Sequence, residues 1–187
     1  MPGAISDSST LIHLSKIGRL HLLREFHKKI SVAPAVWREV VEEGRGSPGS
    51  SELKEAKQAG WIEVVDPTNR TLIHFLRKDL HEGESETIAL AVENDPEVVF
   101  LDESEARRIA RVYGLNITGV IGILIRAKRE EMIPSLREEL DRLRDEAGFW
   151  IGEDVYMKAL RSSKSLTQNK IDNFILQNVV YILWRAK

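Results

Sequence analysis

Two aspartates, Asp7 and Asp102, each follow a short apolar segment that is typical of a β-strand, residues 3–6 and 98–101. In open parallel sheets, binding sites form at the carboxyl ends of the strands, near the point where the strand order reverses. If the two strands are neighbours, the two carboxylates converge on one crevice, where each raises the pKa of the other unless a cation lies between them. Such oxygen ligands suit Mg²⁺ or Mn²⁺, and an ion of this kind can activate water and hold a phosphoryl oxygen.

Each aspartate taken alone has a simpler explanation. Asp7 precedes residues 8–10, a run of Ser and Thr that favours helix starts, so it could serve only as a helix cap. Asp102 could cap the helix expected from Ser104 in the same way. The two aspartates together, at equivalent positions after two strands, favour a shared site over two separate caps.

Further acids on the helix that opens at Pro34 are candidates for the same site. At about 100° per residue, Glu39 and Glu43 flank the buried stripe of this helix and can lean toward a crevice. Glu42 points nearly opposite to the stripe. A solvated acidic face that ends at Gly44 is the simpler explanation for two of the three.

Two more acids, Glu84 and Glu86, lie in the first turn of the helix expected after Gly83. Acids are favoured there in any helix, because the exposed N–H groups of the helix start attract negative charge. Glu86 lies about 200° further round the helix than Glu84. We therefore expect only one of the two to face a shared ion.

Apolar strands alternate with helices along the chain, which predicts a parallel, doubly wound sheet with helices on both faces. The run 98–101 is apolar throughout, as in a strand that is covered on both faces. The expected strands are residues 3–6, 30–33, 61–65, 98–101 and 115–117. The expected helices are residues 8–17, 20–26, 34–44, 72–80, 83–92, 104–113, 119–128 and 134–147, with a short charged helix that ends at Gly60.

The composition is that of an intracellular globular protein. The chain has 187 residues, 42% of them hydrophobic and 30% charged, which suits one domain with an added tail. The absence of cysteine excludes disulfides and thiolate metal sites and favours a cytoplasmic location. No apolar run approaches the roughly 18–20 residues that a membrane span requires. No basic segment followed by an apolar one marks a secretory signal.

The net charge of −2 is low for a protein that binds nucleic acid, whose surface is generally basic. Local basic clusters or bound cations would have to supply the attraction. Arg107, Arg108 and Arg111 follow Asp102, and Arg126, Lys128 and Arg129 form a second cluster, although a solvated helix face is the simpler explanation for most of them. Other chemistries lack their residues: there is no Gly-x-Ser-x-Gly elbow, no Cys nucleophile, no phosphate-binding loop that ends in Lys-Ser/Thr, and no paired zinc spacing among the histidines.

Five segments carry a family resemblance. They are Asp7-Ser8-Ser9, the stretch from Pro34 to Val40, the stretch from Gly83 to Ala91, the stretch from Phe100 to Ser104, and the stretch from Ile117 to Leu124 with Ala127-Lys128 after it. In this order they resemble the PIN domain, and most closely its poorly characterised prokaryotic branch, whose members resemble VapC-type toxins of toxin–antitoxin pairs. Each motif is weak alone, whereas five in order are fairly specific.

The resemblance implies a three-layer α/β/α sandwich with a central parallel sheet, and a ribonuclease whose acids hold one or two Mg²⁺ or Mn²⁺ ions. The acids that correspond by position are Asp7, Glu39, Glu84 and Asp102, with Glu86 as the alternative third acid and Glu103 as a further metal ligand. The substrate-binding residues expected beside them are Ser9, Arg107 and Arg108. The third acid is often Asp in the toxins, and Glu103 stands where the branch often has a second Asp. The longer glutamate arms could weaken metal binding.

The last residues differ in composition from the rest of the chain. Ser162-Ser163-Lys164-Ser165 predicts a linker, so residues 1–161 are expected to form the PIN-like domain and residues 162–187 a helical C-terminal extension. The extension carries an apolar stripe at helical spacing that must be buried, formed by Ile171, Phe174, Ile175, Val179, Ile182 and Leu183. The stripe could pack on its own domain, form a homodimer contact, or bind a partner such as an antitoxin protein.

Two functions of different classes are compatible with these residues. The first is a metal-dependent endoribonuclease that hydrolyses single-stranded RNA in the cytoplasm, as the toxin of a toxin–antitoxin pair. The second is a PIN-like module that binds nucleic acid or protein and has lost productive metal geometry. In neither case is a membrane partner expected.

Overall fold

The computed structural model describes residues 3–163, which form two compact units that divide after Gly119. The first unit contains a sheet of five parallel strands in the order β3-β2-β1-β4-β5. The strands are β1 (Ala4–Ser6), β2 (Ile30–Val32), β3 (Ile62–Val64), β4 (Val98–Phe100) and β5 (Ile117–Thr118). The first four strands lie within the segments predicted for them, whereas β5 shares only Ile117 with the predicted segment 115–117.

The strand order reverses between β1 and β4. From β1 the chain continues to β2 and β3 on one side, and the later strands β4 and β5 lie on the other side. Ala4 pairs with Val98 and Ser6 with Phe100, so the two central strands end at the same level. The residues that follow these two strands are therefore brought together at the edge where open parallel sheets bind their ligands.

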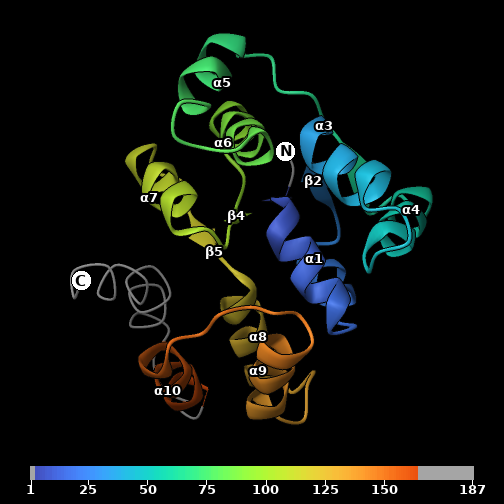
Figure 1. Ribbon diagram of the computed structural model, residues 1–187, viewed down its shortest axis with the longest axis vertical. Coiled ribbons are helices and arrows are strands. Elements are labelled where there is room, and N and C mark those ends of the chain that lie inside the picture. Colours follow the sequence, from blue (N-terminus) through green and yellow to red (C-terminus); the bar gives the residue numbers. More distant parts are fainter. Residues whose placement is uncertain (1–2, 164–187) are drawn as a thin grey trace. The chain divides into compact units, whose positions relative to one another are not determined.

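Helices cover both faces of the sheet, so the unit is a three-layer α/β/α sandwich (Figure 1). On one face, Ile5, Val99 and Ile117 belong to a core that also contains residues of α5 (Arg70–Leu76), α6 (Glu82–Asn94) and α7 (Ser104–Val112). On the other face, Phe100 contacts the ring of His27 at the end of α2 (His21–His27), with 5.5 Å between the ring centroids. Successive strand residues point to opposite faces, which is why Val99 and Phe100 belong to different layers.

The helix predicted from Pro34 to Gly44 is regular only in its first turn. It begins as α3 (Pro34–Trp37) and continues as η1 (Arg38–Glu43), a π-helical segment in which Gly44 N donates to Glu39 O, five residues back, at 3.0 Å. The prediction of one continuous α-helix was therefore wrong. A π-turn differs from an α-turn by one extra residue within the hydrogen-bonded loop, and the pattern of apolar residues does not distinguish the two. Similarly, α5 ends at Leu76 and not at Leu80.

Two further helices complete the first unit, α1 (Ser8–Lys16) and α4 (Ser50–Gln58). Asp7 is the N-cap of α1, and its position directly after β1 makes the turn from strand to helix only one residue long. The glycine- and serine-rich loop before α4 runs from Gly44 to Gly49.

The second unit is helical. It contains α8 (Val120–Arg129), α9 (Leu136–Asp145) and α10 (Glu153–Ser162). Arg129 Nη2 donates to Ser162 O at 2.7 Å, and Tyr156 Oη donates to Asp141 Oδ1 at 2.6 Å, so α10 is hydrogen-bonded to both α8 and α9. The first two helices match the predicted segments, whereas α10 has no counterpart among the helices predicted from the sequence.

The predicted helical extension begins at Ser162 and falls almost entirely outside the described residues, so it and the domain boundary at residue 161 stay predictions. In the described part of the chain, no helix has both the length and the apolar character that crossing a membrane would need.

Candidate active site

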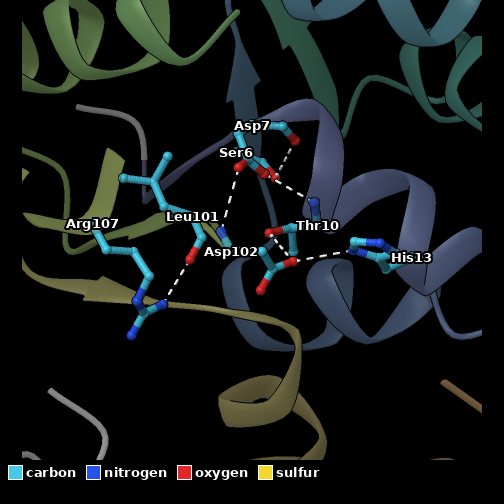
Figure 2. A network of polar contacts seen from close by, with 7 residues as sticks. All are labelled: Ser6, Asp7, Thr10, His13, Leu101, Asp102 and Arg107. Atoms are coloured by element: carbon cyan, nitrogen blue, oxygen red, sulfur yellow. Dashed lines mark hydrogen bonds and ion pairs between the residues drawn. The ribbon is translucent and has the colours of Figure 1, made fainter. Parts of the chain in front are cut away.

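The two aspartates predicted to converge lie side by side at the ends of β1 and β4. Asp7 N donates to Phe100 O at 3.1 Å, which extends the pairing of the two strands by one residue. Asp102 N in turn lies 3.4 Å from Asp7 Oδ2 (Figure 2). The two carboxylates thus share one small region that is built from residues 95 positions apart.

Asp7 is both a helix cap and a member of this pair. Its Oδ1 accepts a hydrogen bond from Thr10 N at 2.9 Å, as an N-cap residue does. The residue is only 1% exposed. Burial, and then the negative charge of Asp102, raise the pKa of the Asp7 carboxyl to about 8, although the hydrogen bonds from Thr10 and Asp102 act in the opposite direction.

Asp102 is not a helix cap. The N-cap position of α7 belongs to Glu103, which leaves the Asp102 side chain directed toward α1. Its Oδ2 accepts a hydrogen bond from Thr10 Oγ1 at 3.0 Å and lies 3.4 Å from His13 Nδ1. The Asp102 side chain is 4% exposed, so this carboxylate is almost as deeply buried as that of Asp7.

Thr10 and His13 were not among the predicted site residues. They lie three and six residues after Asp7, so one face of α1 carries all three side chains. That spacing is the signal in the sequence that could have found them. The spacing indicates site residues only when Asp102 is known to lie against this face of α1, and that position of Asp102 depends on the strand order.

Arg107 is a buried cation beside the pair. Its side chain extends from α7 back to the end of β4, where Nη1 donates to Leu101 O at 2.6 Å. The residue is 4% exposed. Burial lowers the pKa of the Arg107 guanidinium to about 10, and the charges of Asp102 and Asp7 act against that decrease. The guanidinium therefore remains a positive charge at neutral pH.

Gly119, directly after β5, lacks a side chain where the Asp102 carboxylate and the Arg107 guanidinium lie. A Cβ on this residue would overlap Asp102 Oδ1 and would lie 3.0 Å from Arg107 Nη1 and 3.1 Å from Leu101 O. The backbone of Gly119 thus approaches the carboxylate and the guanidinium more closely than any other residue type would allow.

A second group of acids lies around Gly83, at the start of α6. A Cβ on Gly83 would lie 3.4 Å from Glu39 Oε2 and 3.9 Å from Ser8 Oγ, which places Glu39 close to the beginning of α1. The pKa of Glu84 is raised mainly by burial, with further contributions from the charges of Glu103 and Glu39. Glu84 is therefore near enough to both Glu103 and Glu39 for their charges to act on it.

Glu84 and Glu86 have different surroundings. Glu84 Oε2 accepts from His81 N at 2.9 Å and closes the first turn of α6. Glu86 Oε2 accepts from Ala35 N at 2.9 Å, at the start of α3. The two side chains are thus directed to different helix starts, and the charges of Glu39 and Glu103 act on Glu84.

The predicted substrate-binding residues have diverse positions. Ser9 is half-buried in the first turn of α1, and Arg107 is directed inward. Arg108 is exposed and forms an ion pair with Glu105, with Nε–Oε distances of 3.0 and 3.1 Å. Their roles stay predictions.

The oxygen donors of the pair fit a hard divalent cation. Within residues 3–163, no group of three or more His, Asp or Glu side chains is close enough to hold a metal ion by itself. Asp7 and Asp102, however, are two buried carboxylates that disfavour each other's charge, and a cation between such groups removes that cost.

Comparison with known families agrees with this geometry. The family model DUF3368, described as a PIN domain, matches residues 3–165, and the chain belongs to this family. Neither the curated proteins nor the solved structures include a significant match. PIN domains are generally nucleases, which are hydrolases, and typically use divalent metal ions. The resemblance to a PIN domain and the predicted three-layer fold are thus confirmed, and the likeness to VapC-type toxins stays a prediction.

Proposed function

We propose that this protein is a Mg²⁺- or Mn²⁺-dependent endoribonuclease that hydrolyses RNA phosphodiester bonds at the edge of the sheet marked by Asp7 and Asp102. One observation carries the proposal: two carboxylates are buried together at the switch point of a parallel sheet, and the pKa of Asp7 is raised to about 8. A pair built only for stability would not bring like charges together in a buried site.

The residues of the chain have distinct parts in this proposal. Asp7 and Asp102 hold the cation, and Glu84 and Glu39 complete its acidic surroundings from α6 and η1. A bound Mg²⁺ or Mn²⁺ ion supplies a lowered pKa for water and stabilises negative charge on phosphoryl oxygens. Arg107 keeps a positive charge behind the two aspartates, and Ser9 and Arg108 are the candidate contacts to the RNA.

The test is cleavage of labelled single-stranded RNA by the full chain, with Mn²⁺, with Mg²⁺ or with a chelator. We expect cutting only with metal, and a loss on the order of 100-fold or more in Asp7→Asn and in Asp102→Asn. Asp66→Asn is the matched control, because this carboxylate is in the same unit but exposed and paired with Arg70. Metal-dependent cutting that persists in both site variants would exclude this site.

A binding module that has lost productive metal geometry is the second candidate function. It is favoured by the absence of a preformed three-acid group among residues 3–163. Folded native protein that cuts none of several RNAs with either metal, yet binds RNA or a protein, would favour this function over the first.

The identity of the third acid can be tested with isosteric amides. Glu84→Gln keeps an oxygen for His81 N but removes the charge near Glu39 and Glu103, so we expect the cleavage rate to fall on the order of 100-fold. Glu86→Gln keeps the acceptor for Ala35 N, and we expect a rate within about threefold of native. A larger loss in Glu86→Gln than in Glu84→Gln would assign the role to Glu86.

The space above Asp102 provides another test. We expect Gly119→Ala to lower the cleavage rate by roughly 100-fold, because a displacement of reacting groups by about 1 Å has an effect of this size. Gly3→Ala, where the new Cβ would lie 3.4 Å from its nearest neighbour, should cut like the native protein. If Gly119→Ala cleaves RNA at the native rate, the expectation that catalysis depends on the exact position of Asp102 is contradicted.

The proposal extends to the setting of the enzyme. We propose a cytoplasmic protein that acts as the toxin of a toxin–antitoxin pair, with residues 162–187 as the segment that contacts a second copy or an antitoxin protein. A short reading frame beside the gene that encodes a small DNA-binding protein would support this setting.

A further inference from the structure

His13 is the part of the site that the acids of the family do not account for. It lies on α1, its side chain is 18% exposed, and its Nδ1 is 3.4 Å from Asp102 Oδ2. The same oxygen accepts from Thr10 Oγ1 at 3.0 Å. Figure 2 shows both side chains directed from α1 toward the Asp102 carboxylate, while Arg107 lies on the other side of it.

These contacts fix the orientation of the Asp102 carboxylate. Oδ2 is bound from the α1 side by a hydroxyl, with an imidazole nitrogen beside it, and Oδ1 lies against the backbone of Gly119. An ionised carboxylate only accepts hydrogen bonds, so a hydrogen bond between His13 and ionised Asp102 requires that Nδ1 carries a proton. Groups behind a metal-binding carboxylate that orient it in this way contribute strongly to metal affinity.

We propose that His13 is a positioning residue that, together with Thr10, holds the Asp102 carboxylate in the orientation that binds the divalent cation. The inference rests on the proposed function, because it assigns His13 a part in the same site. Its basis is that a hydroxyl and an imidazole nitrogen, both from α1, converge on one oxygen of a side chain that is 4% exposed. An ordinary surface ion pair would leave the carboxylate in solvent.

The position of the proton on His13 can be observed without metal or RNA. Long-range ¹H–¹⁵N spectra of the metal-free protein, recorded at about pH 8.5, where an ordinary imidazole is neutral, report which ring nitrogen carries the proton. We expect Nδ1–H in the native protein and a shift toward Nε2–H in Asp102→Asn, whose amide can donate to the ring in place of accepting. An Nε2–H tautomer in the native protein would overturn the proposal, whatever the protein does to RNA.

Metal affinity then separates a positioning role from a structural one. Mn²⁺ binding is measured by calorimetry on the full chain, beside the cleavage rate, for His13→Asn, His13→Gln and His13→Leu. An Asn amide nitrogen lies close to the place of imidazole Nδ1, whereas a Gln amide nitrogen lies close to the place of Nε2. We expect His13→Asn to bind Mn²⁺ like the native protein, and His13→Gln and His13→Leu to bind roughly 10- to 100-fold more weakly.

The outcomes of the two experiments are distinct. His21→Asn, a change at an exposed residue of α2, is the control and should leave both readouts unchanged. Native affinity in a folded His13→Leu, or an equal loss in His13→Asn and His13→Leu, would overturn the positioning role while leaving the proposed function intact. If His13→Leu does not fold, the comparison of His13→Asn with His13→Gln decides. Native protein that binds no Mn²⁺ would overturn the proposed function together with this inference, whereas protein that binds Mn²⁺ but does not cut RNA would contradict only the proposed function.

Discussion

We expect Asp7→Asn to be inactive and yet more stable than the native protein when no metal is present. The Asp7 carboxyl is buried beside Asp102, and its pKa is raised to about 8. The oxygen of the amide that replaces this carboxyl would still accept from Thr10 N, so the cap of α1 survives the substitution. The substitution therefore removes an unfavourable charge and keeps the cap of α1, and it loses only the longer contact from Asp102 N at 3.4 Å. Such a gain in stability is common where a site is optimised for function.

The expected pH dependence follows from the direction of the shift. A carboxyl whose pKa is raised in the folded state binds its proton more tightly when folded. It therefore contributes most to stability below its unfolded value of 3.8, and that contribution is lost as the pH rises toward about 8. Between about pH 5 and pH 8, the native protein should lose stability relative to Asp7→Asn. At pH 8 the Tm of Asp7→Asn should exceed that of the native protein by several degrees, because 1 kcal/mol corresponds to about 2–4 °C in a protein of this size.

Thermal unfolding of the metal-free proteins across this pH range is the measurement. Added Mg²⁺ should raise the Tm of the native protein and narrow the gap, because it binds the folded state with Asp7 ionised. Asp66→Asn should follow the native curve, since Asp66 is exposed and paired with Arg70. If the curves of Tm against pH for Asp7→Asn and the native protein are parallel, the raised pKa of the Asp7 carboxyl is contradicted.

Much of the fold could be predicted because its signals are local. Each strand lies in a short segment rich in apolar residues, and the aspartates stand where two of those segments end. That Asp7 and Asp102 meet depends on β1 and β4 being neighbours, and the alternation of strands and helices favours such an arrangement but does not specify it. The family motifs supplied that missing information for the acids.

The remaining features depend on contacts between distant segments. His13 and Thr10 belong to the site because they contact Asp102. Glu86 is directed away from it because its carboxylate accepts from Ala35 N, 51 residues away in the sequence. No periodicity in the sequence reports such pairings. The π-helical turn at Glu39 is a different case, because the residues of η1 are equally compatible with an α-helix and only the packing around them decides.

Arg107→Met should be the most destabilising single change at the site. Arg107 is 4% exposed and its guanidinium donates to Leu101 O at 2.6 Å. Burial lowers the pKa of this guanidinium, and the nearby charges of Asp102 and Asp7 act against that decrease. Removal of one partner from a buried group of opposite charges leaves the others uncompensated, which costs about 3–5 kcal/mol. We expect the Tm of Arg107→Met to fall by about 10 °C. The Tm of Arg107→Lys should fall less, because lysine keeps the positive charge although it lacks the planar guanidinium.

The charges, and not the lost packing, should account for most of this effect, and a double-mutant cycle tests that reason. In the Arg107→Met protein, a second change of Asp102→Asn removes a buried charge that has lost its counterion. The pair of changes should therefore cost less than the sum of the single changes, by about 1 kcal/mol or more. Arg108→Met, on the next residue of α7, removes an exposed arginine that is paired with Glu105 and should change Tm by no more than about 2 °C. Additive losses in the cycle would show that Arg107 contributes by filling space, and the positive charge behind the two aspartates would then have no part in holding them together.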